Sequence, residues 1–120
     1  MPDAVPWIEM CPGVHRRTLA AGRGMMQMTV TFTAGATLPE HRHPHEQVTH
    51  VVRGRLRLIL HGGAETHELA AGESFYLASN VPHAAEAPEE ATVVDTFNPP
   101  REDLLARDRE LLPGRPSTGP

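Results

Sequence analysis

Short stretches of alternating apolar and polar residues, separated by turn-forming residues, restrict this chain of 120 residues to a β-rich fold. In residues 26–32, MQMTVTF, the even positions are apolar and the odd positions are polar. In residues 55–60, RLRLIL, three leucines alternate with Arg55, Arg57 and an isoleucine. Because successive side chains of a strand point to opposite faces, each stretch predicts a strand with one buried face.

Five further stretches have the composition of short strands, namely residues 47–52, 65–69, 75–77, 83–87 and 91–97. Turn-forming residues separate the stretches, among them Gly54, the Gly62-Gly63 pair and Gly72. Strands with turns about every eight to twelve residues are typical of an antiparallel sandwich or barrel. The length suits one domain that buries its own core.

The two ends of the chain differ from this pattern. Asn98 is expected to cap a C-terminal helix that has Pro99 in its first turn and runs to about Glu110. Four segments follow from this interpretation: an N-terminal strand or arm packing on the barrel at 1–24, the barrel at 25–98, the helix at 99–112, and a Pro/Gly-rich tail at 113–120 that is expected to be disordered.

Composition excludes several classes of function. The formal net charge is −4 and all 11 basic residues are arginines, which disfavours nucleic-acid binding and excludes Schiff-base chemistry at a lysine. One cysteine, Cys11, permits no internal disulfide. No stretch approaches the ~20 apolar residues of a membrane span, and no secretory signal is visible, so we expect a soluble cytoplasmic protein without membrane partners.

Residues 41–47, HRHPHEQ, carry three imidazoles and a carboxamide. If the segment is extended, His41, His43, His45 and Gln47 point to the same face. Neutral imidazole is the commonest metal ligand at physiological pH, so the cluster predicts a metal site. Strand parity alone admits the His43/His45 pair as readily as the His41/His43 pair.

The spacing around this cluster resembles the first motif of small single-domain cupins. Gly35 is followed by five residues, His41-Arg-His43, three residues, Gln47, six residues and Gly54. Those proteins have a glutamate where this chain has Gln47.

The second cupin motif is also recognisable. Gly72 is followed by five residues, Ala78-Ser-Asn80, two residues and His83, with Ala78 and Asn80 replacing a proline and a glycine. Asparagine tolerates the left-handed backbone almost as well as glycine, so the turn should survive. The resemblance covers about residues 25–105 and implies an all-β, cupin-type double-stranded β-helix (jelly-roll) barrel with a short C-terminal helix.

The resemblance implies one divalent metal ion held by His41, His43, Gln47 and His83. Only the family spacing prefers His41 to His45, which is then expected beside the metal or at the surface. Three imidazoles and a neutral amide leave the charge of the ion uncompensated, which favours Lewis-acid chemistry and an anionic ligand. These ligand types would accept Zn, Ni, Fe, Mn or Co.

A closer resemblance comes from HRHPHEQV at 41–48, NVPHAAEA at 80–87 and DTFNPPRED at 95–103. These segments are similar to the pectin-degradation cupins that convert Δ4,5-unsaturated galacturonate monomers into linear keto acids. The resemblance implies that Asp95, Phe97 and Arg101 face the substrate, a small anionic sugar acid. Asp95 would move a proton, Arg101 would hold the carboxylate, and Phe97 would pack on the sugar ring.

Strand parity supports part of this assignment, because Val93, Asp95 and Phe97 share one face. A carboxylate on a core-facing position is costly unless it is paired or functional. The structural alternative is an Asp95–Arg101 ion pair that closes the mouth of the barrel.

Two other functions stay open on the sequence. One is an iron-dependent cupin dioxygenase, which normally uses the glutamate that Gln47 replaces. The other is a non-catalytic cupin that binds a small acid. Whichever function holds, we expect a homodimer that pairs through exposed strand edges.

Overall fold

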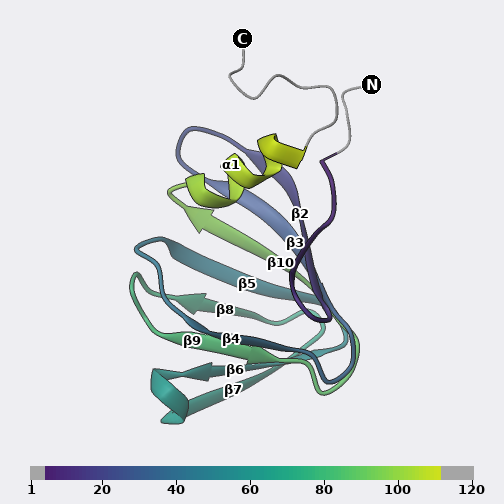
Figure 1. Ribbon diagram of the computed structural model, residues 1–120. Helices are drawn as coiled ribbons and strands as arrows, with labels where there is room; N and C mark the ends of the chain where they lie inside the picture. Colours follow the sequence, from purple (N-terminus) through teal and green to yellow (C-terminus); the bar gives the residue numbers. More distant parts are fainter. Residues whose placement is uncertain (1–4, 112–120) are drawn as a thin grey trace.

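Two antiparallel sheets that face each other make up the molecule, as Figure 1 shows for the computed structural model, which describes residues 5–111. The larger sheet has the order β1 (Ile8–Cys11), β2 (Val14–Ala21), β3 (Met26–Phe32), β10 (Ala91–Asn98), β5 (Glu46–Arg53) and β8 (Ser74–Leu77). The smaller sheet has the order β4 (Thr37–His41), β9 (His83–Glu86), β6 (Arg55–Leu60) and β7 (Glu65–Ala70). A 3₁₀ turn, η1 (His61–Gly63), joins β6 to β7. The predicted all-β jelly-roll fold is confirmed.

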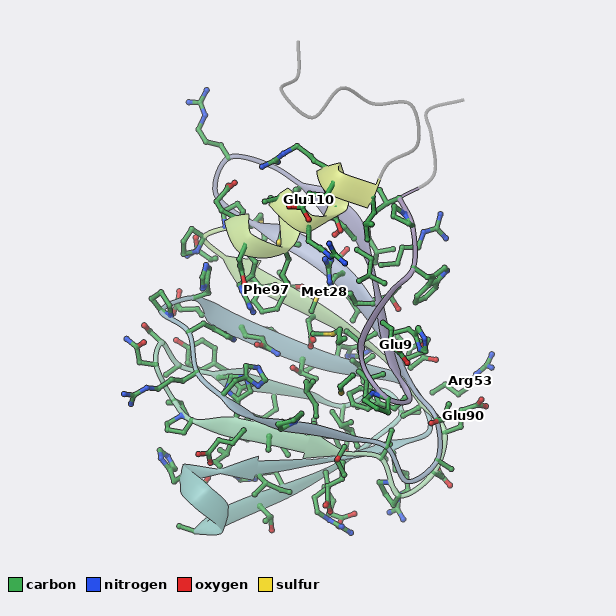
Figure 2. All side chains as sticks on the ribbon, in the orientation of Figure 1. Glu9, Met28, Arg53, Glu90, Phe97 and Glu110 are labelled. Atoms are coloured by element: carbon green, nitrogen blue, oxygen red, sulfur yellow. The ribbon has the colours of Figure 1, made fainter. Side chains whose placement is uncertain are left out.

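In the alternating stretches of the sequence, the apolar residues at every second position are buried in the core, and their polar neighbours are more exposed. In β3 the four even-numbered residues are buried, and in β6 the three leucines are buried while Arg55 is exposed. Figure 2 shows Met28 and Phe97 pointing into the space between the sheets, and Arg53 and Glu90 pointing away from it. Burial of these apolar faces is the main stabilising contribution to such a sandwich.

Strand β10 lies at the centre of the larger sheet, between β3 and β5. Asp95 is paired in register with Met28 on one side and Thr49 on the other. Phe97 is paired in the same way with Met26 and Gln47. Directly paired residues point to the same face of a sheet, so the functional candidates of β10 and β5 lie side by side on the inner face.

Left-handed backbone shapes the turns at Gly54 and Asn80, which flank strands of the site. Gly54 has φ 79°, and a Cβ at this position would overlap the carbonyl oxygen of Glu90. Asn80 has φ 63°, as its tolerance of this conformation predicted, and its backbone N–H donates to the His43 carbonyl at 2.8 Å. This bond ties the turn before β9 to the histidine segment.

Residues 41–47 do not form one strand, so the interpretation in which four ligand-type side chains share one strand face is wrong. His41 ends β4 in the smaller sheet, whereas Gln47 lies in β5 of the larger sheet. Pro44 lies between them, has no N–H for a strand ladder and falls at the bend where the chain crosses between the sheets.

The C-terminal helix α1 (Glu102–Leu111) is present but begins later than predicted. Asn98, the predicted cap, is the last residue of β10, and two prolines follow it. The residue before a proline is biased toward extended backbone, so the helix starts only after Arg101, whose carbonyl accepts from the Leu105 N–H at 3.0 Å.

Strands β1 and β2, from the segment expected to be an arm, are hydrogen-bonded members of the larger sheet. The predicted disordered tail at 113–120 lies outside the described residues. Among residues 5–111 no helix has the length and apolar character needed to cross a bilayer. The cytoplasmic location stays a prediction of the sequence.

A buried ion pair fixes α1 to the sheet. The Arg16 guanidinium in β2 lies 3.0 Å from Asp108 Oδ1, and the Thr18 hydroxyl donates to Asp108 Oδ2 at 2.6 Å. Arg16 also donates to the Leu104 carbonyl at 3.1 Å. Arg16 and Asp108 are 1% and 5% exposed, so each charge depends on the other for compensation.

Candidate functional site

Three histidines from the two motifs converge at one end of the sandwich. His41 at the end of β4 and His83 at the start of β9 are paired in register across the smaller sheet. His43 follows β4, and one ring nitrogen from each of the three histidines lies within 4.8 Å of the others. The structure thus brings together residues that lie up to 42 positions apart in the sequence (41 to 83).

Backbone carbonyls fix which nitrogen of each ring carries the proton. Since a carbonyl oxygen only accepts, the Nδ1–H of each ring must be the donor, and Nε2 keeps its lone pair. The three bonds run from His41 to the Pro39 carbonyl at 2.9 Å, from His43 to the His45 carbonyl at 3.1 Å and from His83 to the Val81 carbonyl at 2.8 Å.

The imidazoles of His43 and His83 are held in the neutral form that binds metals. Burial and the nearby Arg101 cation lower the pKa of His43 to about 4, and burial lowers the pKa of His83. The Nε2 atom of His83 is buried and has no hydrogen-bond partner among residues 5–111. A buried lone pair without a partner is costly, and a divalent metal ion would satisfy it. The residues therefore fit the expected metal.

Gln47 and Asp95 are joined to this cluster by a line of buried polar groups. Gln47 Oε1 lies 3.1 Å from His43 Nε2, and the Gln47 amide N–H donates to the Thr49 hydroxyl at 2.9 Å. The Thr49 hydroxyl in turn donates to Asp95 Oδ1 at 2.7 Å. Burial raises the pKa of Asp95 to about 6, although the hydrogen bond from Thr49 partly offsets this.

Arg101 pairs with Asp103 instead of Asp95. Its Nε and Nη2 donate to the two carboxylate oxygens of Asp103 at 3.2 and 3.0 Å. The guanidinium carbon lies 5.2 Å from the ring centre of Phe97, within cation–π range. The Asp95–Arg101 ion pair considered as a structural alternative is absent. Arg101 therefore occupies neither carboxylate oxygen of Asp95.

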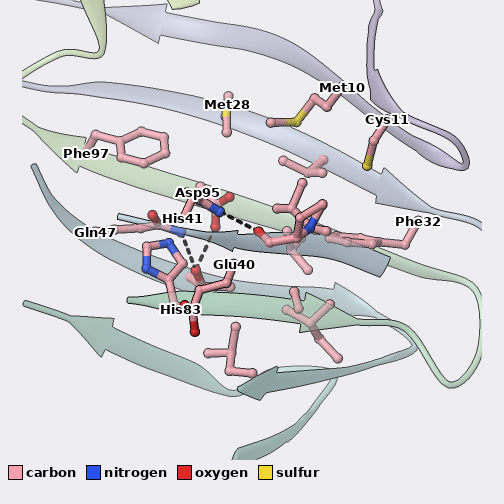
Figure 3. A pocket seen from close by; sticks show the side chains of 18 of the residues that line it. Met10, Cys11, Met28, Phe32, Glu40, His41, Gln47, His83, Asp95 and Phe97 are labelled. Carbon is pink, nitrogen blue, oxygen red and sulfur yellow. Dashed lines mark hydrogen bonds between the residues drawn. The ribbon is translucent and has the colours of Figure 1, made fainter. Parts of the chain in front are cut away.

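His41, His83, Gln47, Asp95 and Arg101 are among the residues that line a cavity of about 360 Å³ (Figure 3). Gln47, His83 and Phe97 lie at one end, and Cys11 and Phe32 lie at the other. The wall between them is mostly aliphatic, from Val30, Leu38, Leu56, Leu58 and Val93. The cavity thus offers polar groups at one end, among them the Arg101 cation, and an apolar surface beyond them.

Several lining residues were not predicted. Thr49 lies two residues after Gln47 on the same strand, so strand parity contains the signal for it. Met10, Cys11 and Glu40 carry no motif, and only the packing of β1 and β4 places them at the cavity. His45 lies outside the three-histidine group, with its ring centre 5.3 Å from that of His43.

Known proteins share this arrangement of strands. A family model for the cupin domain matches residues 28–97. The structure of KdgF from Halomonas sp. is similar with a TM-score of 0.76 and 33% sequence identity, over 82% of this chain and 92% of that one. An RmlC-like cupin from Shewanella frigidimarina has a TM-score of 0.76 and 32% identity, over 83% of this chain and 88% of that one.

A more distant neighbour is salicylate 1,2-dioxygenase from Pseudoaminobacter salicylatoxidans. It has a TM-score of 0.70 and 18% identity over 75% of this chain and 26% of that chain, a likeness that extends to the fold alone. No curated protein matches this chain.

Proposed function

This chain belongs to the cupin family, and from that premise we propose that it opens and tautomerises 4,5-unsaturated uronate monomers of the galacturonate type into linear keto acids. One observation carries the proposal: a buried carboxylate, Asp95, lines the same cavity as Arg101 and two members of the histidine cluster, His41 and His83. Ring opening by proton transfer needs these groups and neither a redox step nor a nucleophile. The similarity to KdgF and the motifs shared with pectin-degradation cupins support it.

His41, His43, Gln47 and His83 would hold the metal ion. When bound there, a divalent ion supplies Lewis-acid polarisation of substrate oxygens. All four ligands are neutral, and Arg101 adds a positive charge nearby, so the polar end of the cavity favours an anionic substrate.

Arg101 and Phe97 would position the sugar acid. A guanidinium can bind a carboxylate with two parallel hydrogen bonds. The guanidinium of Arg101 is already held in a fixed plane by its two hydrogen bonds to Asp103. Phe97 is 1% exposed and forms part of the cavity wall, where its ring offers an apolar surface to the sugar.

Asp95 would carry the proton. It accepts the proton of the hemiacetal hydroxyl while the bond between the anomeric carbon and the ring oxygen breaks, which leaves an aldehyde and an enolate. Asp95 then returns the proton to the enol carbon, and the enolate becomes a ketone. The same proton is taken and given back, so the reaction is an isomerisation.

A second candidate function rests on the aliphatic wall of the cavity. Val30, Leu56, Leu58 and Val93 suit the apolar body of a small aromatic acid better than a polyhydroxylated sugar. This observation favours an iron-dependent cupin dioxygenase, or a cupin that binds such an acid without turnover.

We expect the purified protein of known metal content to accelerate the loss of the ultraviolet absorbance of unsaturated galacturonate. The enol-ether chromophore disappears when the ring opens, so the rate is read directly against the spontaneous reaction. Removing the metal with a chelator should return the rate to the spontaneous one, and adding back a divalent ion should restore it.

The same sample distinguishes the other functions. Oxygen consumption with ferrous iron and an aromatic acid, without uronate turnover, would replace the proposal by the dioxygenase. Tight binding of a small acid, with neither uronate turnover nor oxygen consumption, would support the non-catalytic binding function.

We also propose a homodimer. Val48, Val52 and Tyr76 are exposed on β5 and β8, at one edge of the larger sheet, where apolar side chains favour contact with a second chain. Sedimentation velocity at micromolar concentration should give twice the mass of one chain. A single species with the mass of one chain would contradict this.

A further inference from the structure

Thr49 lies between the predicted metal ligand and the predicted proton carrier. It is 2% exposed, and its hydroxyl is the only polar group of its side chain. It lies 2.9 Å from the Gln47 amide nitrogen and 2.7 Å from Asp95 Oδ1. One hydroxyl group therefore contacts two neighbours, as an acceptor for one and a donor to the other.

The direction of these two bonds follows from the groups involved. A carboxylate only accepts, so the Thr49 proton is donated to Asp95. The hydroxyl oxygen can then only accept from Gln47, and it receives the amide N–H. An amide whose NH₂ is held on one side presents its carbonyl oxygen on the other, which is the side of His43.

At His43 the amide oxygen meets a second lone pair. His43 Nδ1 donates to the His45 carbonyl, so Nε2 of the neutral ring has no proton to offer. Gln47 Oε1 lies 3.1 Å from this Nε2. These two acceptor atoms, Gln47 Oε1 and His43 Nε2, repel each other unless a cation lies against both. A metal ion bound by both atoms would be such a cation.

We propose that Thr49 is a positioning residue that orients the Gln47 amide so that its oxygen, and not its NH₂ group, faces the metal site. The inference rests on the metal site of the proposed function and goes further, because it explains how a neutral amide can act as a ligand there. Without the hydroxyl, the amide NH₂ loses its acceptor on Thr49 and keeps only its contact with Asp95, so it is freer to rotate and present N–H groups, which bind no cation.

A pair of substitutions at Thr49 tests the proposal. Thr49→Val replaces the hydroxyl by a methyl group of similar size, whereas Thr49→Ser keeps the hydroxyl and removes the methyl group. We expect Thr49→Val to weaken Zn²⁺ binding about 10- to 100-fold, the usual effect of losing a group that orients a ligand. Thr49→Ser should keep most of the affinity. Competition with a chromophoric chelator measures both.

A second background separates orientation from packing. Gln47→Glu supplies two equivalent oxygens, so its ligand atom needs no orientation by a hydroxyl. In the Gln47→Glu protein, Thr49→Val should therefore change Zn²⁺ affinity much less than it does in the unaltered chain. An equal loss in both backgrounds, or no loss in either, would overturn the proposal.

Thermal unfolding of the metal-free variants, followed by circular dichroism, shows that each one folds. No uronate enters these measurements. The role of Thr49 can therefore fail while the ring-opening reaction stands, and the reaction can fail while the role of Thr49 stands.

Discussion

Replacing Asp95 by asparagine is expected to lower the turnover of unsaturated uronate by about 10²- to 10⁴-fold, the range that general acid–base catalysis contributes. Asparagine has nearly the same shape and its oxygen can still accept from the Thr49 hydroxyl, but it cannot carry a proton between substrate atoms. The metal content should stay as in the unaltered protein, because the three imidazoles and Gln47 are unchanged. The ultraviolet assay and metal analysis of the same preparation measure both quantities.

A surface carboxylate provides the matched control. Glu90 is exposed and points away from the space between the sheets, so Glu90→Gln should keep the full rate (Figure 2). If Asp95→Asn turned over substrate at the unaltered rate with its metal bound, Asp95 would not be the proton carrier. Asp95→Ala, which removes the carboxylate entirely, should lose turnover in the same way while its metal content stays intact.

The second large effect is expected on stability, at the ion pair between β2 and α1. Asp108→Ala leaves the Arg16 guanidinium buried without its counter-charge, and breaking a buried pair in this way costs about 3–5 kcal/mol. Urea unfolding followed by circular dichroism should show this loss as a lower midpoint with little change in slope.

Helix α1 also carries its own control. Glu110 pairs with Arg107 at 3.0 Å, but both side chains are more than half exposed, so Glu110→Ala should change the midpoint little. Replacing both buried partners, as in Arg16→Met with Asp108→Leu, should recover most of the stability lost in Asp108→Ala. Equal midpoints for Asp108→Ala and Glu110→Ala would show that the buried pair contributes no more than a surface pair.

The strands were predictable because their signal is local. Residues 26–32 alternate strictly and residues 55–60 alternate apart from Ile59, and the structure has β3 and β6 over the same residues. The start of α1 was not predicted, because Asn98 has the composition of a helix cap but is taken up by the hydrogen bonds of β10 to β5. Pairing between distant strands outweighed the local preference.

The grouping of three histidines was predictable from the sequence, and the arrangement around them was less so. The motif spacing named His41, His43 and His83, which the structure brings together, but the single-strand interpretation of residues 41–47 missed the change of sheet at Pro44. Arg101 was expected to reach Asp95 or a ligand, and its pairing with Asp103 depends on where α1 begins. Side-chain partners of this kind follow from tertiary packing, which spacing in the sequence does not contain.

The polar groups that join Asp95 to His43 depend on the pairing of two strands, because Thr49 of β5 donates across to Asp95 of β10. Asp95 and Thr49 are direct partners between β10 and β5, as are Phe97 and Gln47. A slip of β5 by one residue would turn every side chain to the opposite face, so that Val48 and His50 would replace Gln47 and Thr49 beside β10. The alignment of two neighbouring strands therefore decides the reactivity of this cavity, and a one-residue insertion within β5 would alter it without changing any residue of the site.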